Sequence, residues 1–304
     1  MIEELGTLNR VYHYTSVDAL FAILEGYRNR KDKKQAFLPF WASNVFDEND
    51  KREMEDGYNY IKQFLPQFEI DNNIPEKQRL SEIYKDTNRE EMCRIDFLRL
   101  KKKETTECGI VPYVISLSKL HDFLPMWTLY GNMGKGVCLA FDFDKLINEL
   151  LYYAGKFTIG SVAYDEDSAK TSVFEILSRS YDFFNSSRDI ISNLADFCFF
   201  LSPFFKRKDY KYEQEVRIVT NKPYGFDEDG LTHITKDTLN HILNGTIEHK
   251  IEKHIEFPIS ASALSEVMIG PNADSKVLEH IIGLEREDCG LQFIIKCSNI
   301  SFEK

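Results

Sequence analysis

The chain has 304 residues, of which 43% are hydrophobic and 29% are charged. This composition is typical of a globular protein with a large buried core, and it excludes a disordered chain. With a formal net charge of -11, the molecule as a whole repels nucleic acid, so any such contact needs a local basic patch.

The cysteines and the N-terminal residues exclude several further classes. The six cysteines are scattered without a Cys-x-x-Cys pair, which argues against a disulfide framework or a zinc site. The first residues lack the basic and apolar regions of a signal peptide, and no apolar run approaches the ~20 residues of a membrane span. We therefore expect a cytoplasmic protein with no membrane contact.

The first predicted unit is a strand followed by a helix. Residues Arg10–Ser16 are rich in β-branched and aromatic side chains, which favours a strand. Thr15 and Asp18 have the spacing of a capping box, and apolar residues at helical spacing follow them. Gly26 is the expected C-cap. This arrangement places His13 near the end of a strand that enters a helix.

The later elements alternate between strands and helices. Helices are expected at 50–64, 76–102, 171–205 and 275–284, and a single helical turn at 126–131. Strands or extended segments are expected at 37–50, 110–118, 136–143, 157–164, 212–220, 251–259, 264–270 and 291–301. There is no internal repeat. The simplest organisation is one mixed α/β domain over 1–304, with mainly helical insertions near 50–105 and 171–205.

The most informative strand is Tyr212–Val219. If it is extended, Glu213, Glu215 and Arg217 share one face with roughly 7 Å between neighbours. Such a face is costly unless it borders water, a ligand or internal partners. It is either a charged edge, an Arg217–Glu215 pair that locks the sheet, or a site. The preceding basic stretch Lys206–Lys211 suits a phosphate-bearing substrate or a nucleic acid.

His13 is either a satisfied structural histidine or a ligand-binding group. Its place at the end of a strand favours the second reading, because α/β sheets commonly hold ligands there. The segment Gly131–Gly136 leads into a strand and lacks the spacing of a phosphate-binding loop, so we expect a glycine turn. His249 and His254 lack the spacing of a metal site.

Four motifs in order resemble the bacterial family known as domain of unknown function twenty-nine seventy-one. In chain order, the first two are Tyr12-His-Tyr-Thr-Ser16 and the acidic turn Asn44–Asp50. The third combines Ile115-Ser-Leu-Ser118, Met126-Trp-x-x-Tyr-Gly131 and Gly136-Val-Cys-Leu139, and the fourth is Tyr212-Glu-Gln-Glu-Val-Arg217. The resemblance spans residues 11–303. The acidic turn departs from the Asn-Asp-Pro pattern of the family. Membership implies no particular reaction.

A second, more distant resemblance supplies a chemistry. The strand His-Tyr-Thr followed by a helix is similar to the opening of ADP-ribosyltransferases, which implies a split central β-sheet and NAD as a substrate. The resemblance implies that His13, with Tyr14 and Thr15, holds the NAD ribose. It implies further roles for Ser118 in a partial Ser-Thr-Ser strand, Trp127 or Tyr130 as the aromatic that stacks on nicotinamide, Glu215 as the catalytic carboxylate, Glu213 at the acceptor, and Arg217 at the pyrophosphate.

This resemblance leads to a hypothesis about the reaction. Breaking the nicotinamide–ribose bond produces an oxocarbenium-like centre, which a nearby carboxylate stabilises. The expected function is an ADP-ribosyltransferase-like enzyme that needs no metal, such as a toxin or anti-phage defence effector. Its acceptor would be nucleic acid or protein, bound through the basic stretch Lys206–Lys211.

Two alternatives stay open. The first is a non-catalytic module that binds a nucleotide or a partner within a bacterial defence or regulatory system. The second is a metal-dependent nuclease that uses Asp47, Asp50, Glu213 and Glu215. The absence of a lysine at the usual strand position beside the acids weighs against the nuclease.

Overall fold

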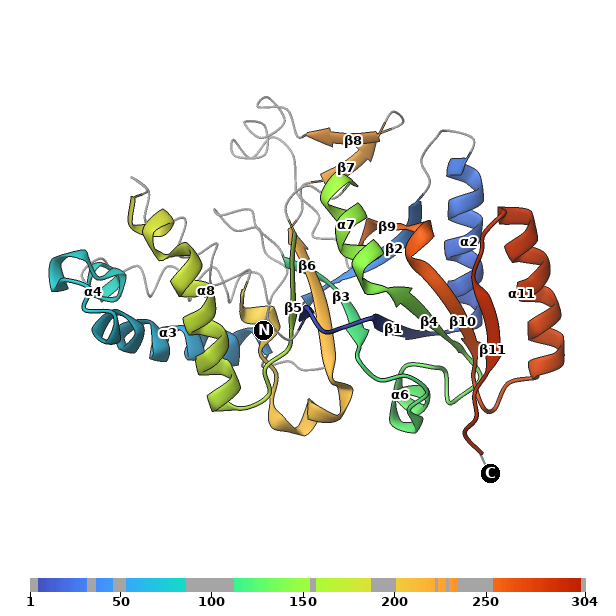
Figure 1. Cartoon of the computed structure of the whole chain (residues 1–304), viewed down its shortest axis with the longest axis horizontal. Helices are drawn as coiled ribbons and strands as arrows, with labels where there is room; N and C mark the ends of the chain where they lie inside the picture. The colour runs from blue at the N-terminus through green and yellow to red at the C-terminus, as the bar shows by residue number, and fades with distance from the viewer. Residues whose placement is uncertain are drawn as a thin grey trace, which may run out of the picture.

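The computed structural model describes most of the chain. The described residues are 5–31, 37–45, 53–85, 112–153, 157–186, 201–221, 224–227, 230–233 and 254–301. Within them the chain forms a mixed α/β structure around a mostly antiparallel sheet (Figure 1). None of the described helices combines the length and the apolar composition needed to cross a membrane.

The central sheet contains nine strands. They are β1 (Arg10–Thr15), β2 (Phe37–Asn44), β3 (Pro112–Ser118), β4 (Val137–Asp142), β5 (Phe157–Ser161), β6 (Glu215–Asn221), β9 (His254–Ser260), β10 (Leu264–Ile269) and β11 (Ile294–Cys297). The main order is β11-β10-β4-β1-β3-β2-β9, and β6 pairs with both β3 and β5. Only β10 and β11 run parallel among the described pairs. A separate hairpin joins β7 (Tyr224–Asp227) to β8 (Gly230–His233).

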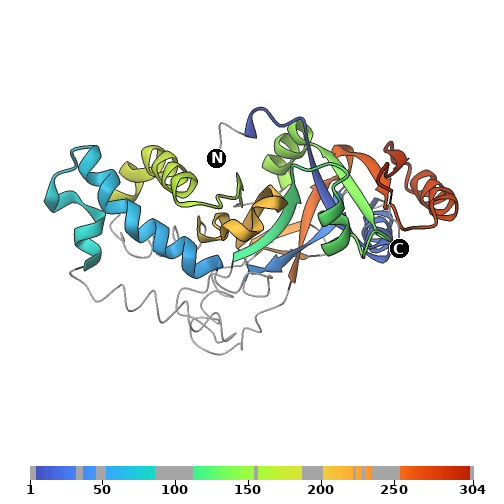
Figure 2. The same ribbon diagram turned by 90° about the horizontal axis from the view of Figure 1, so that it is seen from below.

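Several of the helices gather at the two ends of an elongated molecule (Figure 1). They are α2 (Val17–Lys31), α3 (Glu53–Asp71), α4 (Leu80–Lys85), α6 (Leu124–Leu129), α7 (Phe143–Tyr153), α8 (Glu166–Ser186) and α11 (Ser275–Cys289), with 3-10 turns η2 (Glu76–Gln78), η3 (Ser202–Phe204), η4 (Lys208–Glu213) and η5 (Ala261–Ala263). Helices α3, α4 and α8 lie at one end, and α2 and α11 lie beside the far half of the sheet (Figures 1 and 2).

The expected strand–helix opening is present, with two corrections. The backbone N–H of Ala19 donates to the hydroxyl of Ser16 at 3.1 Å, so Ser16 rather than Thr15 caps α2. Gly26 does not end this helix, which continues to Lys31. A Cβ at Gly26 would lie 2.5 Å from Cγ of Pro39 on β2, so this glycine allows the helix to approach the sheet.

Most other elements agree with the sequence prediction, apart from their bounds. Helix α7 was not predicted, and α8 begins five residues before the predicted start at 171. The predicted helix 76–102 contains η2 and α4, and its remainder lies outside the described residues, as does most of the acidic turn. The predicted strand Tyr212–Thr220 begins only at Glu215, because η4 occupies the residues up to Glu213.

A turn at 131–136 connects α6 to β4. Asn132, Met133 and Gly134 all have positive φ angles, of 50°, 55° and 77°. This confirms a glycine turn rather than a phosphate-binding loop. The turn delivers β4 into the middle of the sheet, where five consecutive residues from Val137 to Phe141 are buried on both faces.

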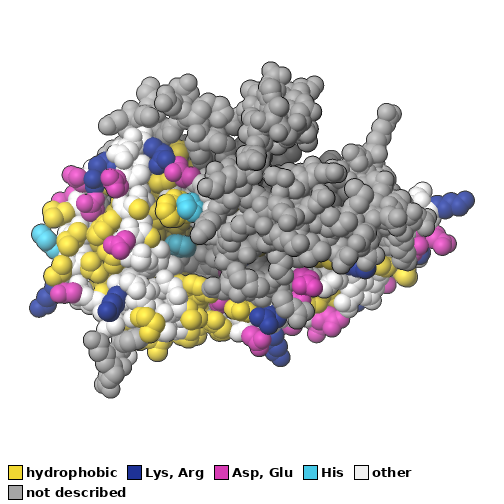
Figure 3. Space-filling model, turned by 180° about the vertical axis from the view of Figure 1, so that it is seen from behind, with side chains coloured by type: hydrophobic (Ala, Val, Ile, Leu, Met, Phe, Trp, Pro, Cys, Tyr) yellow, Lys and Arg dark blue, Asp and Glu magenta, His cyan; other side chains and the backbone are white. Residues whose placement is uncertain are grey.

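Two apolar clusters form the described core. The larger one joins both halves of the sheet to α2, α3 and α8, and a smaller one packs α6 on the sheet through Tyr14, Met126, Trp127, Cys138 and Met268. On the outside, hydrophobic side chains gather at the end that carries α11 (Figure 3), where Val277 and Leu284 are more than half exposed.

Replacing Gly136 by Ala should destabilise the fold. A Cβ at this position would lie 2.1 Å from the carbonyl oxygen of Thr15, so the turn and the end of β1 must separate. We expect a loss of about 1–3 kcal/mol in the free energy of unfolding, measured by urea denaturation.

The matched control is Gly283→Ala in α11. Its Cβ would meet no atom closer than 3.9 Å, and alanine is the better helix former by about 1 kcal/mol. This variant should therefore be as stable as the parent or more stable. Equal effects of the two substitutions would contradict the close approach at Gly136.

Candidate functional site

The candidate site lies where the sheet splits. Strand β6 pairs with β3 along its whole length from Pro112 to Ser118. On the other edge, β3 pairs with β1 only at Ser118 and with β2 only at Tyr113 and Val114. Strands β1 and β2 therefore diverge from the middle of β3. A cavity of about 210 Å³ opens there, and five consecutive β3 residues, 114–118, line it.

His13 spans this split. Its Nδ1 lies 3.0 Å from the carbonyl oxygen of Ser116, and its ring packs edge-on against Phe40. Because a carbonyl can only accept, Nδ1 carries the proton and donates it. Burial lowers the pKa of His13, so the imidazole is neutral near pH 7. Its Nε2 is then an acceptor, and the residue lines the cavity.

A buried ion cluster forms another part of the cavity wall. Nζ of Lys206 lies 2.8 Å from a carboxylate oxygen of Glu213 and 2.8 Å from one of Glu215. All three residues line the cavity, although each is at most 5% exposed. The two glutamates therefore lie together as expected, but because they share a lysine and not because they share a strand face. The backbone of Gln214 between them is in the left-handed region, with a φ of 42°, and this interrupts the strand.

Arg217 is the fourth member of the cluster. Its Nε donates to Glu215 at 2.7 Å and its Nη1 donates to the carbonyl of Pro203. Burial by itself would raise the pKa of Glu215, but the charges and hydrogen bonds of Arg217 and Lys206 outweigh it and lower the pKa to about 2. The cluster holds two carboxylates and two cations, so its formal charges balance.

Two further groups hold Glu213. The hydroxyl of Tyr130 donates to its carboxylate at 2.6 Å, and the hydroxyl of Ser118 donates to its backbone carbonyl at 2.7 Å. Tyr130 and Ser118 also line the cavity. The C-terminal end of β3 thus fixes the backbone of Glu213, and Tyr130 at the end of α6 fixes its carboxylate.

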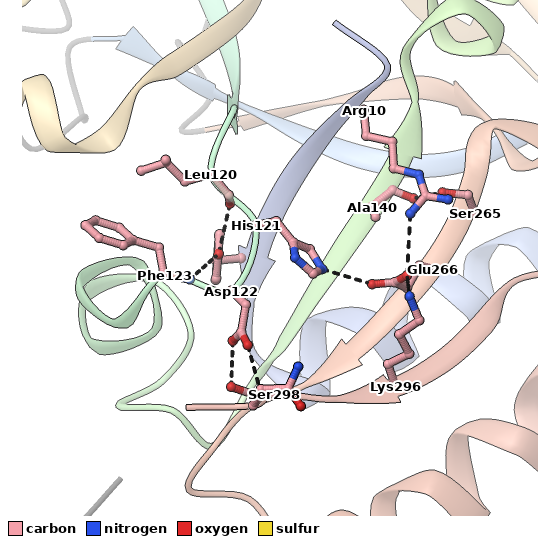
Figure 4. Close-up of polar contacts among 12 residues, drawn as sticks. Arg10, Leu120, His121, Asp122, Phe123, Ala140, Ser265, Glu266, Lys296 and Ser298 are labelled. Carbon is pink, nitrogen blue, oxygen red and sulfur yellow. Dashed lines mark hydrogen bonds and ion pairs between the residues drawn. The ribbon is translucent and has the colours of Figure 1, made fainter. Parts of the chain in front are cut away.

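The connection between β3 and α6 is anchored to the far end of the chain (Figure 4). Asp122 accepts hydrogen bonds from the indole of Trp127 at 2.8 Å and from the hydroxyl of Ser298, and the backbone N–H of Asn299 donates to it at 2.9 Å. The C-terminal segment after β11 therefore positions α6, which ends directly before Tyr130.

A second buried carboxylate, Glu266 on β10, supports the same connection. His121, Lys296 and Arg10 converge on it, with Nε2 of His121 at 3.1 Å and Nζ of Lys296 at 2.6 Å (Figure 4). Burial raises the pKa of Glu266, but the hydrogen bonds from Lys296 and His121 dominate and lower it. The ring of His121 in turn contacts Tyr12, which lines the cavity.

A second, larger cavity lies on the other side of Glu215. Its volume is about 610 Å³, and Glu215 is common to the linings of both cavities. Its wall is polar and includes Lys119, Ser161, Asp165 and Lys211. The Oγ of Ser161 is buried and has no hydrogen-bond partner in the described part of the chain.

Three residues expected to contact NAD do not line the first cavity. Trp127 and Arg217 are fully buried and bonded internally, which leaves them no surface for a ligand, and Thr15 is half-buried at the end of β1. The alternative that Arg217 holds Glu215 in place agrees with this geometry. Tyr14 does reach the cavity, but its hydroxyl donates to the carbonyl of Leu120 at 2.9 Å.

The basic stretch Lys206–Lys211 is not a uniform cationic surface. Lys206 is buried in the ion cluster, Lys211 lies 3.3 Å from Asp165, and Arg207 lies over the ring of Tyr210. Arg207, Lys208 and Lys211 are exposed. Lys206 thus belongs to the site, although the charge pattern alone assigned this lysine to the surface. Its signal was its position directly after the apolar run Leu201–Phe205.

Of the four residues expected for a metal-dependent nuclease, Asp47 and Asp50 lie outside the described residues. Glu213 and Glu215 already accept from Lys206, Tyr130 and Arg217. Within the described ranges, no group of three or more His, Cys, Asp or Glu side chains has the arrangement of a metal site.

Comparison with known proteins finds a family model that matches the segment around the ion cluster. Residues 126–218 match the model of the family described as protein of unknown function (DUF2971). The family expected from the ordered motifs is therefore confirmed over this segment, which runs from α6 to β6 and includes the whole ion cluster but not His13. No curated protein and no solved structure matches the chain significantly.

Replacing Glu215 by Gln should flatten the acid dependence of stability. The pKa of Glu215 in the folded protein is about 2, against 4.5 for an ordinary glutamate. Its stabilising contribution is therefore present above the unfolded-state value and is lost as the pH falls toward the folded-state value. The wild type should lose roughly 3 kcal/mol of unfolding free energy through this group. Urea unfolding at a series of pH values measures the slope.

Two further readouts separate this effect from a general loss of charge. At neutral pH the Glu215→Gln variant should be less stable by about 3–5 kcal/mol, because Lys206 and Arg217 lose a buried partner. The control is Glu279→Gln, which removes one carboxylate from an exposed position of α11. Identical pH slopes in the wild type and in Glu215→Gln would contradict a buried, ionised Glu215.

Proposed function

Because the confirmed family segment carries the carboxylates of this cavity, we propose that the protein is an ADP-ribosyltransferase-like enzyme that uses NAD as a substrate. One observation carries the proposal: His13 and Glu215, which are about 200 positions apart in the sequence, line one cavity at the split of the sheet. A split central sheet with a histidine in its first strand agrees with the resemblance to these transferases.

The state of His13 suits a sugar ligand. Because the Nδ1–H of His13 donates to the carbonyl of Ser116, Nε2 of the same ring can accept a hydrogen bond. A ribose hydroxyl is the complementary donor. A cavity of about 210 Å³ is smaller than the ~300–1,000 Å³ of sites for drug-sized ligands. We infer that it takes the ribose and the group attached to C1′, while the remainder of the dinucleotide lies outside.

Glu215 suits the bond that breaks. In the transfer, the bond between C1′ and the nicotinamide nitrogen breaks, and the nitrogen keeps the electron pair. The positive charge that develops on the ribose is stabilised by a fixed carboxylate where water is excluded. The acceptor then bonds to C1′ and gives its proton to a carboxylate, for which Glu213 is the candidate.

The two cavities that meet at Glu215 suit a reaction between two substrates. The first would hold the donor and the second, polar cavity the acceptor. The walls of the second cavity contain both signs of charge, from Lys119, Lys211, Asp165 and Glu175. A polar protein side chain or a nucleotide hydroxyl agrees with this lining, and a role as a toxin or anti-phage effector remains part of the proposal.

A second candidate function is favoured by the ion cluster itself. Lys206 and Arg217 pair with Glu213 and Glu215 at 2.7–2.8 Å, and a carboxylate held in this way is less available to a developing positive charge. This observation favours a module that binds a nucleotide without transforming it, within a defence or regulatory system.

Release of nicotinamide from NAD separates the two functions. Purified protein with a protein or nucleic-acid acceptor should release nicotinamide, measured by liquid chromatography. His13→Ala and Glu215→Gln should each reduce the rate at least 100-fold, because they remove the ribose acceptor and the stabilising charge. The control is Leu284→Ala, which truncates an exposed side chain on α11 and should leave the rate unchanged.

The remaining outcomes decide between the candidates. Calorimetric binding of NAD without nicotinamide release would favour the binding module. If NAD neither binds nor is consumed with any class of acceptor, both candidates fail. Circular dichroism of each variant shows whether a lost activity reflects a lost fold.

A further inference from the structure

Trp41 is an exposed aromatic side chain at the first cavity. It lies on β2 between the buried residues Phe40 and Ala42, and it is 63% exposed. Trp41 and Ser43, both on the same face of β2, line the cavity together with His13. One of the two tryptophan side chains of the protein is thus exposed to water beside the candidate ribose site, which costs free energy unless a ligand covers it.

One face of this indole is already covered by a flat ring. The imidazole of His254, on the neighbouring strand β9, stacks on Trp41 with ring centroids 4.1 Å apart and an interplanar angle of 16°. Backbone pairing between β2 and β9 over seven residues fixes the two rings relative to each other. The high exposure of Trp41 therefore belongs to its other face and its edges.

We propose that Trp41 is a stacking platform for the adenine base of the dinucleotide whose nicotinamide ribose lies in the first cavity. The proposal rests on the proposed function, because it assigns the part of the substrate that the enclosed cavity leaves outside. A preformed stack of two rings accepts a third planar ring with little loss of side-chain entropy. Stacking of a base on an aromatic side chain contributes about 1–3 kcal/mol.

The charges around the cavity favour a ligand that is bound through its aromatic ring rather than through its phosphates. Lys206, the cation that lines the cavity, bonds both Glu213 and Glu215, and the cluster has balanced charge. Affinity for the phosphates of a nucleotide is therefore weak inside the cavity. Most of the binding free energy then has to come from the sugar contacts and from the stacked base.

The two tryptophans of the chain make the test direct. Trp127, which belongs to α6, is fully buried and packs against Tyr14, so its fluorescence is insulated from ligands, whereas Trp41 is exposed. Adenosine 5′-monophosphate should quench the fluorescence of the wild type. Ribose 5-phosphate, which has the same sugar and phosphate without the ring, should not quench it.

Variants of Trp41 give the matched comparison. Trp41→Ala should weaken the binding of adenosine 5′-monophosphate about tenfold in calorimetry, and Trp41→Phe should retain most of the affinity. Neither variant should change the affinity for ribose 5-phosphate. Because Trp41 contributes little to the core, both variants should unfold at the wild-type urea concentration, and Leu129→Ala controls for the loss of another exposed apolar side chain.

Three binding results would overturn the platform. They are equal affinity of wild type and Trp41→Ala for adenosine 5′-monophosphate, equal quenching by ribose 5-phosphate, and quenching by single-stranded oligonucleotides alone. Failure of the proposed function is distinguishable from these. If the mononucleotide stacks on Trp41 while NAD is not consumed, the platform stands and transfer fails. If the Trp41→Ala variant releases nicotinamide from NAD with the wild-type KM for NAD, the transferase proposal stands and the platform fails.

Discussion

The site depends on the position of one lysine ammonium between two carboxylates. Lys206 is buried and bonds Glu213 and Glu215 at equal distances, while Arg217 balances the remaining charge. Removing one member of such a cluster leaves an uncompensated charge away from water, which costs several kcal/mol. The cluster therefore joins the segment after η3 to the start of β6, and it holds the wall of the cavity in one arrangement.

This constraint affects the ligand as well as the fold. Lys206 and Arg217 are paired with the two glutamates, and His13 is neutral. The wall of the first cavity therefore has hydrogen-bonding groups and apolar surface but no net charge. A sugar satisfies such a wall better than a phosphate does. The charged parts of a nucleotide would lie outside, near the exposed Arg207, Lys208 and Lys211 or in solvent.

Local patterns predicted most of the elements, since alternation and helical spacing are properties of neighbouring residues. Strands β1, β3 and β4, the turn at 131–136 and the sequence β10-α11-β11 follow from such patterns. Gly26 was misassigned because its role is set by Pro39 on another element. The start of β6 was misplaced because the left-handed backbone at Gln214 interrupts a run that would otherwise alternate as a strand.

The membership of the site was only partly predictable for a related reason. His13, Glu213, Glu215 and Tyr130 do line one cavity, and ordered motifs indicated them. Lys206 was taken for a surface charge. The apolar run before it was a signal of burial, but that run does not reveal the pairing with two glutamates seven and nine residues later. Trp41 had a signal in the alternation of β2, where it is the outward residue between Phe40 and Ala42. Its stack on His254 depends on a strand more than 200 positions away.

Glu215 is fixed by more contacts than a structural ion pair needs. Its carboxylate is held by Lys206 and Arg217, and its backbone N–H donates to the hydroxyl of Tyr164 at 2.8 Å, from the side of the second cavity. A carboxylate that only neutralised Arg217 could lie anywhere in the core. One held rigidly where two cavities meet has a defined position toward a ligand in each, which is the preorganisation that group transfer requires. Rigidity would also help a module that binds one ligand. A carboxylate placed between two cavities, however, serves transfer from one substrate to another rather than the binding of a single ligand. This position is the structural reason for placing transfer before binding.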